Sequence, residues 1–132
     1  MEVQTSYTDN DVQGVWAEYQ DGVKLLIARA GNPRFLKASD RAEAPHRRDI
    51  ARNRLASDTA LDIQCKAMGE GILLGWTGID AGGAELPYTP ENAAKVLRHN
   101  TRVREFVFEF ALEESNYRQD AIDDTAKKSA AT

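Results

Sequence analysis

The chain has 132 residues, and its 42% hydrophobic and 29% charged residues are typical of one globular domain with a single core. Its net charge of −4 argues against a general nucleic-acid binder. Cys65 is the only cysteine, which excludes an intramolecular disulfide and a cysteine-based zinc site, and the apolar runs are too short to cross a bilayer. A reducing cytosol is the compartment that fits this composition best.

The charge is distributed unevenly. Residues 34–54 contain seven Arg or Lys and three Asp or Glu, a net charge of +4, whereas residues 105–124 contain seven acidic residues and one Arg, a net charge of −6. This asymmetry has three interpretations: the two segments pair with each other, they contact a charged partner, or they are two solvated helix faces.

Two short apolar segments predict an N-terminal β-hairpin. Residues 15–19 and 23–28 flank Asp21-Gly22, a pair that favours a type I′ turn because both central residues take positive φ. The expected cross-strand pairs are Trp16 with Ile27, Glu18 with Leu25, and Gln20 with Val23. Residues 1–11 are polar and are expected to form a flexible lead-in.

A helix is predicted directly after the hairpin. Asn32 is a good N-cap, and Pro33 occupies the first helical position, where its missing N–H costs nothing. Pro45 is expected to end this helix near Glu43. Its buried side is predicted to contain Phe35, Leu36 and Ala42.

Two further helices are expected in the middle of the chain. Residues 46–55 are basic and are predicted to be helical, with Ile50 and Leu55 facing inward. Ser57-Asp58 is interpreted as the cap of the next helix, which leads to Trp76. Residues of one apolar face recur along it at helical spacing: Leu61, Cys65, Met68 and Ile72. Cys65 is therefore interpreted as a buried structural cysteine.

Residues 75–92 are predicted to form the corner of the fold. Trp76 ends the preceding helix, glycines allow turns, residues 84–88 are extended, and Thr89-Pro90 starts another helix. The last long helix follows, with an apolar stripe that includes Phe106 and Phe110. Its opposite side has a stripe of like charge: Glu105, Glu109 and Glu113.

Together these elements predict a small α+β fold, in which an N-terminal β-hairpin packs on a bundle of about four to five helices. A short extended segment is expected near residues 84–88. Residues 1–122 would form a single domain, and residues 123–132 a disordered tail.

The sequence contains no motif that specifies a reaction. His46 and His99 have no nucleophile beside them. The segment that starts at Asp9-Asn10-Asp11 departs from a calcium loop at its third ligand, Gln13, and at its twelfth position, Gln20. We therefore expect a non-enzymatic protein without cofactor or metal. The candidate residues for binding a partner are the aromatic and apolar ones of the corner and the charged ones of the two segments: Trp76, Leu86, Tyr88, Arg47, Arg48, Glu105, Glu109 and Glu113.

An ordered set of residues between 14 and 118 resembles the tail assembly chaperones of long-tailed phages and prophages. The set consists of Gly14-Val15-Trp16 with Tyr19 and Gly22, residues 27–35, residues 73–79, Gly83, residues 86–92, Val96-Leu97, and Phe106-Val107 with Asn116-Tyr117. No single motif is diagnostic, and the specificity comes from the order and spacing. Many relatives have an acidic residue where this chain has Gly75.

The resemblance implies a non-catalytic protein that binds the helical, apolar tape measure protein and helps recruit tail tube subunits in the host cytoplasm. It also implies absence from the mature virion. Self-association is a further expectation, and so is a longer frameshifted product, since Lys127-Lys128 codons can form a slippery site. Two alternatives are a small DNA-binding regulator that uses the basic helix 46–54, and a structural tail or head-tail protein. Nucleic-acid binding is the less favoured of these functions, and membrane association is not expected.

Overall fold

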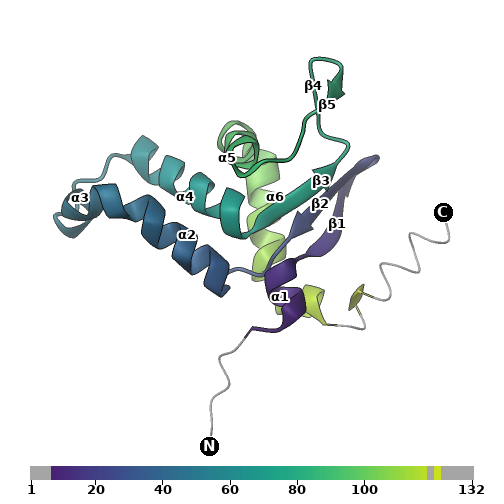
Figure 1. Ribbon diagram of the computed structural model, residues 1–132, viewed down its shortest axis with the longest axis horizontal. Helices are drawn as coiled ribbons and strands as arrows, with labels where there is room; N and C mark the ends of the chain where they lie inside the picture. Colours follow the sequence, from purple (N-terminus) through teal and green to yellow (C-terminus); the bar gives the residue numbers. More distant parts are fainter. Residues whose placement is uncertain (1–6, 119–120, 123–132) are drawn as a thin grey trace, which may run out of the picture.

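The computed structural model describes residues 7–118 and 121–122, which form an α+β fold (Figure 1). The elements in chain order are α1 (Asp9–Gln13), β1 (Val15–Gln20), β2 (Val23–Ile27), α2 (Pro33–Glu43), the 3₁₀ turn η1 (Ala44–His46), α3 (Arg47–Ala51), α4 (Ser57–Gly71), β3 (Leu73–Thr77), β4 (Asp80–Ala81), β5 (Ala84–Glu85), α5 (Pro90–His99), α6 (Thr101–Leu112) and the 3₁₀ turn η2 (Glu114–Tyr117). The expected N-terminal hairpin on a mainly helical bundle is confirmed.

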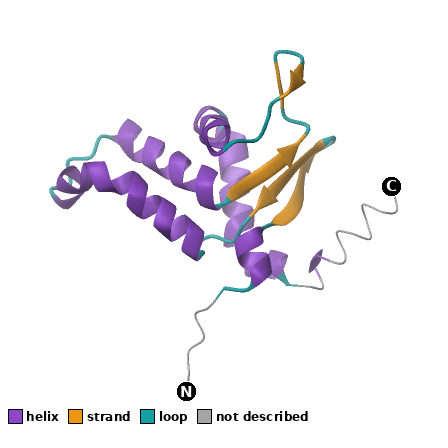
Figure 2. Ribbon diagram, viewed as in Figure 1, coloured by secondary structure: helices purple, strands orange, loops and turns teal. Residues whose placement is uncertain are grey.

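The hairpin is extended to a three-stranded antiparallel sheet in the order β1-β2-β3 (Figure 2). Gln20 lies opposite Val23, as predicted, but an irregularity between Glu18 and Gln20 shifts the remaining pairs by one residue. Trp16 therefore lies opposite Leu26, and Glu18 opposite Lys24, instead of Ile27 and Leu25. Because β1 has one extra residue at this irregularity, every cross-strand partner beyond it is shifted. A register counted from the turn alone does not predict this shift.

Strand β3 is the main element that the sequence analysis missed. Trp76 was expected to end a helix, but α4 ends at Gly71 and Trp76 lies on β3, opposite Leu25 of the central strand. Ile72 continues the helical spacing of α4, so that the apolar run of residues 72–74 could be assigned to either element. Pairing with β2 decides the assignment, and that contact is distant in sequence.

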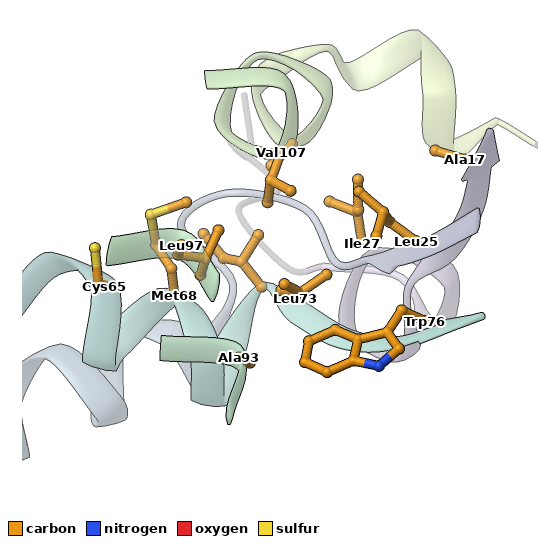
Figure 3. Packing of buried hydrophobic residues seen from close by; sticks show 12 residues of the cluster. Ala17, Leu25, Ile27, Cys65, Met68, Leu73, Trp76, Ala93, Leu97 and Val107 are labelled. Atoms are coloured by element: carbon orange, nitrogen blue, oxygen red, sulfur yellow. The ribbon is translucent and has the colours of Figure 1, made fainter. Parts of the chain in front are cut away.

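The core lies between the inner face of the sheet and helices α4, α5 and α6 (Figure 3). In the close-up, Met68 of α4, Leu97 of α5 and Val107 of α6 point toward Leu73, Ile27 and Leu25 of the sheet. Cys65 is buried on α4, as the sequence predicted. The members with no exposed surface include Leu25, Ile27, Met68, Ile72, Leu73, Ala93, Leu97, Val107 and Ala111.

Helices α2 and α4 run side by side and antiparallel, joined by η1 and α3 at their far end (Figure 1). Asn32 attaches the start of α2 to the end of α4. Its side-chain oxygen accepts from the N–H of Phe35 at 3.0 Å, as expected of an N-cap, and its amide donates to the carbonyl of Gly71 at 2.9 Å. A methyl group on Gly71 would overlap the Phe35 backbone, so this crossing requires glycine.

The outer part of this helix pair differs from the prediction. Helix α2 ends at Glu43, as expected from Pro45. However, Leu36 is 57% exposed, and Ile50 on the short helix α3 is 40% exposed instead of facing inward. Leu55 is half-buried. The basic helix predicted for residues 46–55 is shorter than expected: η1 and α3 end at Ala51, and residues 52–55 are not helical. At the far end of the pair, no further element among the described residues covers Ile50.

The two ends of the fold also refine the prediction. The lead-in expected to reach residue 11 instead contains α1, which starts with a capping box between Thr8 and Asp11. At the other end, Thr89 caps α5 as predicted, and α6 is a separate helix. Residues 1–6 and the tail expected at 123–132 lie outside the described residues. No helix within the described part of the chain combines the length and the apolarity needed to span a bilayer.

Candidate functional site

The three corner residues predicted to bind a partner are brought together, and their contacts are internal. The indole N–H of Trp76 donates to the carbonyl of Leu86 at 2.8 Å, and its ring packs edge-on against Tyr88 with centroids 5.0 Å apart. Trp76 is only 7% exposed, and Leu86 and Tyr88 pack around the core cluster. These contacts attach residues 86–88 to β3 and leave little of the indole for a partner.

The hydroxyl of Tyr88 completes the corner. It lies 3.0 Å from the carbonyl oxygen of Gly69 and 2.7 Å from that of Leu73, so it donates at the junction of α4 and β3. Burial raises the pKa of this phenol, because the ionised form would lose hydration. Tyr88 therefore remains a neutral donor, and its role in the structure is to hold the extended return against the helix end.

The opposite face of the sheet is open. Along β1, Val15 and Ala17 are buried whereas Trp16 and Glu18 are exposed, with Trp16 at 45%. Leu26 lies across from Trp16 on β2, and Gly75 across from Leu26 on β3.

A methyl group on Gly75 would lie 3.8 Å from the Trp16 ring and 3.6 Å from the Leu26 Cβ. The Trp16 ring thus extends across β2 toward β3. We call Trp16, Leu26 and Gly75 the outer sheet patch.

The predicted arginines lie far from the corner, on the projecting helix pair. Between residues 39 and 64 every side chain is at least partly exposed; we call this stretch the arm. Arg47 reaches Asp40 at 3.4 Å within the arm. Three further arginines of the arm have no carboxylate within ion-pair distance in the described part of the chain: Arg48, Arg52 and Arg54.

The predicted acidic stripe lies on the solvent side of α6 and is not purely acidic. Glu105 and Glu109 are exposed together with Phe108 (38%) and Leu112 (58%), at the spacing of one helix face. We call these four residues the α6 stripe. Glu113 is not part of it: the helix ends at Leu112, and Glu113 Oε1 accepts from the Ser115 hydroxyl at 2.8 Å.

One groove of about 430 Å³ lies between α4 and α5. Part of its charged lining is paired: Arg98 contacts Asp62 at 2.7 Å, and Glu70 contacts Arg41 at 2.6 Å. Cys65 at this groove has a raised pKa because it is buried, which keeps it a thiol. The described residues contain no group of three His, Cys, Asp or Glu that could hold a metal ion. This groove therefore provides no activated nucleophile.

One long stretch of the chain matches a known family. This stretch includes the start of α2 and the corner. A family model described as YdaY prophage protein matches residues 30–128. The chain belongs to the YdaY prophage protein family. It is therefore a prophage-associated protein. Comparisons with curated proteins and with solved structures gave no match.

The YdaY family member exposes apolar residues that the sequence analysis did not select, namely Trp16, Phe108 and Leu112. Two signals could have identified them. Trp16 shares its side of β1 with Glu18, since side chains alternate along a strand. Phe108 and Leu112 are three and seven residues after Glu105, so they lie among the carboxylates and not with the apolar stripe of α6.

Proposed function

We propose that this prophage protein is a tail assembly chaperone, which binds the tape measure protein and assists assembly of the tail tube without catalysis. Two observations of different kinds support the proposal. The chain belongs to a prophage protein family, and its residues resemble the ordered set found in tail assembly chaperones. We further propose that it acts in the bacterial cytoplasm and is absent from the finished particle, which mass spectrometry of purified virions would test.

The outer sheet patch is the structural observation that carries the proposal. A tape measure protein is expected to expose apolar helix faces before the tube encloses it. A helix with an apolar stripe can lie on an open apolar surface, with a few large side chains as anchors. Trp16 is such an anchor, and Gly75 lets its ring lie close to the backbone of β3 beside Leu26.

The surroundings of the patch suit a chaperone that must release its client. Glu18 and Lys24 lie opposite each other on β1 and β2 and give the patch a charged rim. A small apolar contact with a polar rim supports reversible binding, and the net negative charge of the chain keeps the complex soluble.

Co-expression with the tape measure protein of the same prophage tests the proposal. We expect the wild-type chain to raise the soluble fraction of the tape measure protein and to copurify with it. Trp16→Glu should abolish both effects. Leu36→Glu is the matched control, because it places the same charge at an exposed apolar residue of α2 and should leave both unchanged. If the tape measure protein is no more soluble with the wild-type chain than alone, the proposal is wrong.

The arginines of the arm that form no ion pair with another described residue favour a DNA-binding regulator as the second candidate. Arg48, Arg52 and Arg54 are exposed at one end of the molecule, where they could contact phosphates. A regulator would bind duplex DNA with an affinity that falls steeply as salt increases, and Arg48→Gln with Arg52→Gln would weaken it. The chaperone proposal expects no such binding at physiological salt.

A further inference from the structure

The free end of the arm, around α3, carries exposed residues at the far end of the helix pair (Figure 1). Helices α2 and α4 are buried against each other near the sheet, at Ala38 and Cys65, but no residue between these two positions is buried. Figure 1 shows α3 at the free end of this pair, away from the sheet and away from α6. A projecting helix pair with an exposed tip is suited to reach another molecule.

The tip of the arm combines an apolar residue with positive charge. Ile50 is 40% exposed and lies three residues after Arg47, on the same side of α3. Arg48, Arg52 and Arg54 surround it in sequence, and none of them has a carboxylate partner in the described structure.

The α6 stripe has the complementary composition. Phe108 and Leu112 are its apolar residues, and Glu105 and Glu109 are its charges. The two carboxylates are four residues apart on one helix, an arrangement that mildly destabilises the helix unless positive charge lies nearby. No Arg or Lys of the described residues comes within ion-pair distance of either.

The two surfaces do not meet within one molecule. The ion pairs of the arm involve residues of the arm, α4 or α5: Arg47 with Asp40, Arg41 with Glu70, and Asp58 and Asp62 with Arg98. None of them involves α6. The first interpretation of the charge asymmetry, internal pairing of the basic and acidic segments, is therefore not what the described structure shows. A basic and apolar tip and an acidic and apolar stripe remain exposed on different parts of the fold.

We infer that the occupant of the α6 stripe is the arm of a second copy of this chain. Ile50 packs against Phe108 and Leu112, while the arginines of the tip approach Glu105 and Glu109. Because the two surfaces differ, the contact is head-to-tail. A head-to-tail contact repeats from each copy to the next. The copies form a ring if the rotation between neighbours leads back to the first copy, and an open chain if it does not. The outer sheet patch takes no part in this contact between copies, so it remains free to bind a client.

Sedimentation of the full chain tests the inference. We expect association that grows with protein concentration. The dissociation constant should rise at least about tenfold between about 0.05 M and about 0.5 M NaCl, since salt screens exposed charges. The arm variant Arg48→Gln with Arg52→Gln and the stripe variant Glu105→Gln with Glu109→Gln should each be monomeric. All four positions are exposed, and circular dichroism should show that both variants remain folded.

Mixing the two variants separates head-to-tail contact from other modes. The intact arm of the stripe variant can bind the intact stripe of the arm variant, so the mixture should form a 1:1 dimer and nothing larger. Lys24→Gln and Glu18→Gln, the matched controls on the outer sheet face, should associate like the wild type. A wild-type chain that stays monomeric at low salt, association that survives in either variant, or a mixture that stays monomeric would overturn the inference.

Discussion

The corner around Trp76 and the outer face around Trp16 belong to the same three-stranded sheet, yet their tryptophans differ in almost every contact. Trp76 is 7% exposed, donates a hydrogen bond to Leu86 and packs on Tyr88. Trp16 is 45% exposed and lies over a glycine. The first indole stabilises the fold, and the second is available to a partner.

The comparison shows that a conspicuous sequence segment need not be a binding site. Residues 75–92 combine a tryptophan, several glycines and a proline-capped helix start, and they carry much of the resemblance to tail assembly chaperones. The side chains of Trp76 and Tyr88, the two large aromatic residues of this segment, make internal contacts. The exposed apolar residues that can bind lie in ordinary segments, a hairpin strand and an amphipathic helix.

Truncation of two neighbouring leucines should give the largest difference in stability between the two faces of the sheet. Leu25→Ala empties a position with no exposed surface and should lower the free energy of unfolding by about 2–5 kcal/mol. Leu26→Ala, the next residue on the open face, should cost about 1 kcal/mol or less. Urea unfolding measures both. Equal losses would contradict the assignment of inner and outer faces.

The two tryptophans should respond differently to the same conservative change. Trp76→Phe removes the donor to the Leu86 carbonyl and part of a buried ring, and should cost about 1–3 kcal/mol. Trp16→Phe should change stability by less than about 0.5 kcal/mol. Thermal unfolding of the two variants provides the measurement, and a larger loss for Trp16→Phe would reverse the roles proposed for them.

The hydroxyl of Tyr88 should make a smaller, separable contribution to the corner. Tyr88→Phe leaves the ring in place but removes the donor near the Gly69 and Leu73 carbonyls, and should cost about 1 kcal/mol. Tyr19→Phe is the control, because the structure assigns no hydrogen bond to the Tyr19 hydroxyl among the described residues. Denaturant unfolding should therefore show no loss for Tyr19→Phe.

High pH should destabilise the fold through a second buried tyrosine. Tyr117 donates to the Ile27 carbonyl at 3.1 Å, and burial raises its pKa. A pKa raised in the folded state gives stability that is complete below the unfolded pKa of about 10 and is lost as pH rises toward the folded value. Near pH 10.5 the loss should be about 1 kcal/mol or less, and Tyr117→Phe should reduce this pH dependence. If the free energy of unfolding of the variant falls with pH as steeply as that of the wild type, Tyr117 is not the source of the pH dependence.

Elements set by local chemistry could be predicted from the sequence, and elements set by distant pairing could not. Asn32 and Thr89 cap α2 and α5 as expected, because a cap needs only a few neighbouring residues. Strand β3 was missed because its identity depends on pairing with β2, far away in the chain. The exposure of Ile50 was missed because periodicity shows that a helix has an apolar side but not whether anything covers it.

The candidate site was predictable to a smaller extent. The charge asymmetry was visible in the sequence, and the structure assigns its two halves to the arm and to α6. Glu105 and Glu109 share the α6 stripe, but Glu113 caps the following turn. The predicted Trp76 and Tyr88 form internal contacts, whereas Trp16, which the predicted register placed opposite an apolar partner, is the exposed aromatic residue of the sheet.

Fluorescence of the Trp76→Phe variant tests the central claim most directly, because Trp16 is then the only tryptophan of the chain. The variant is titrated with a soluble, tryptophan-free segment of the tape measure protein. Binding at the outer sheet patch predicts a blue shift of the Trp16 emission and reduced quenching by acrylamide, since the indole leaves water. Binding that leaves both signals unchanged would show that the client lies elsewhere and would contradict the role given to Trp16.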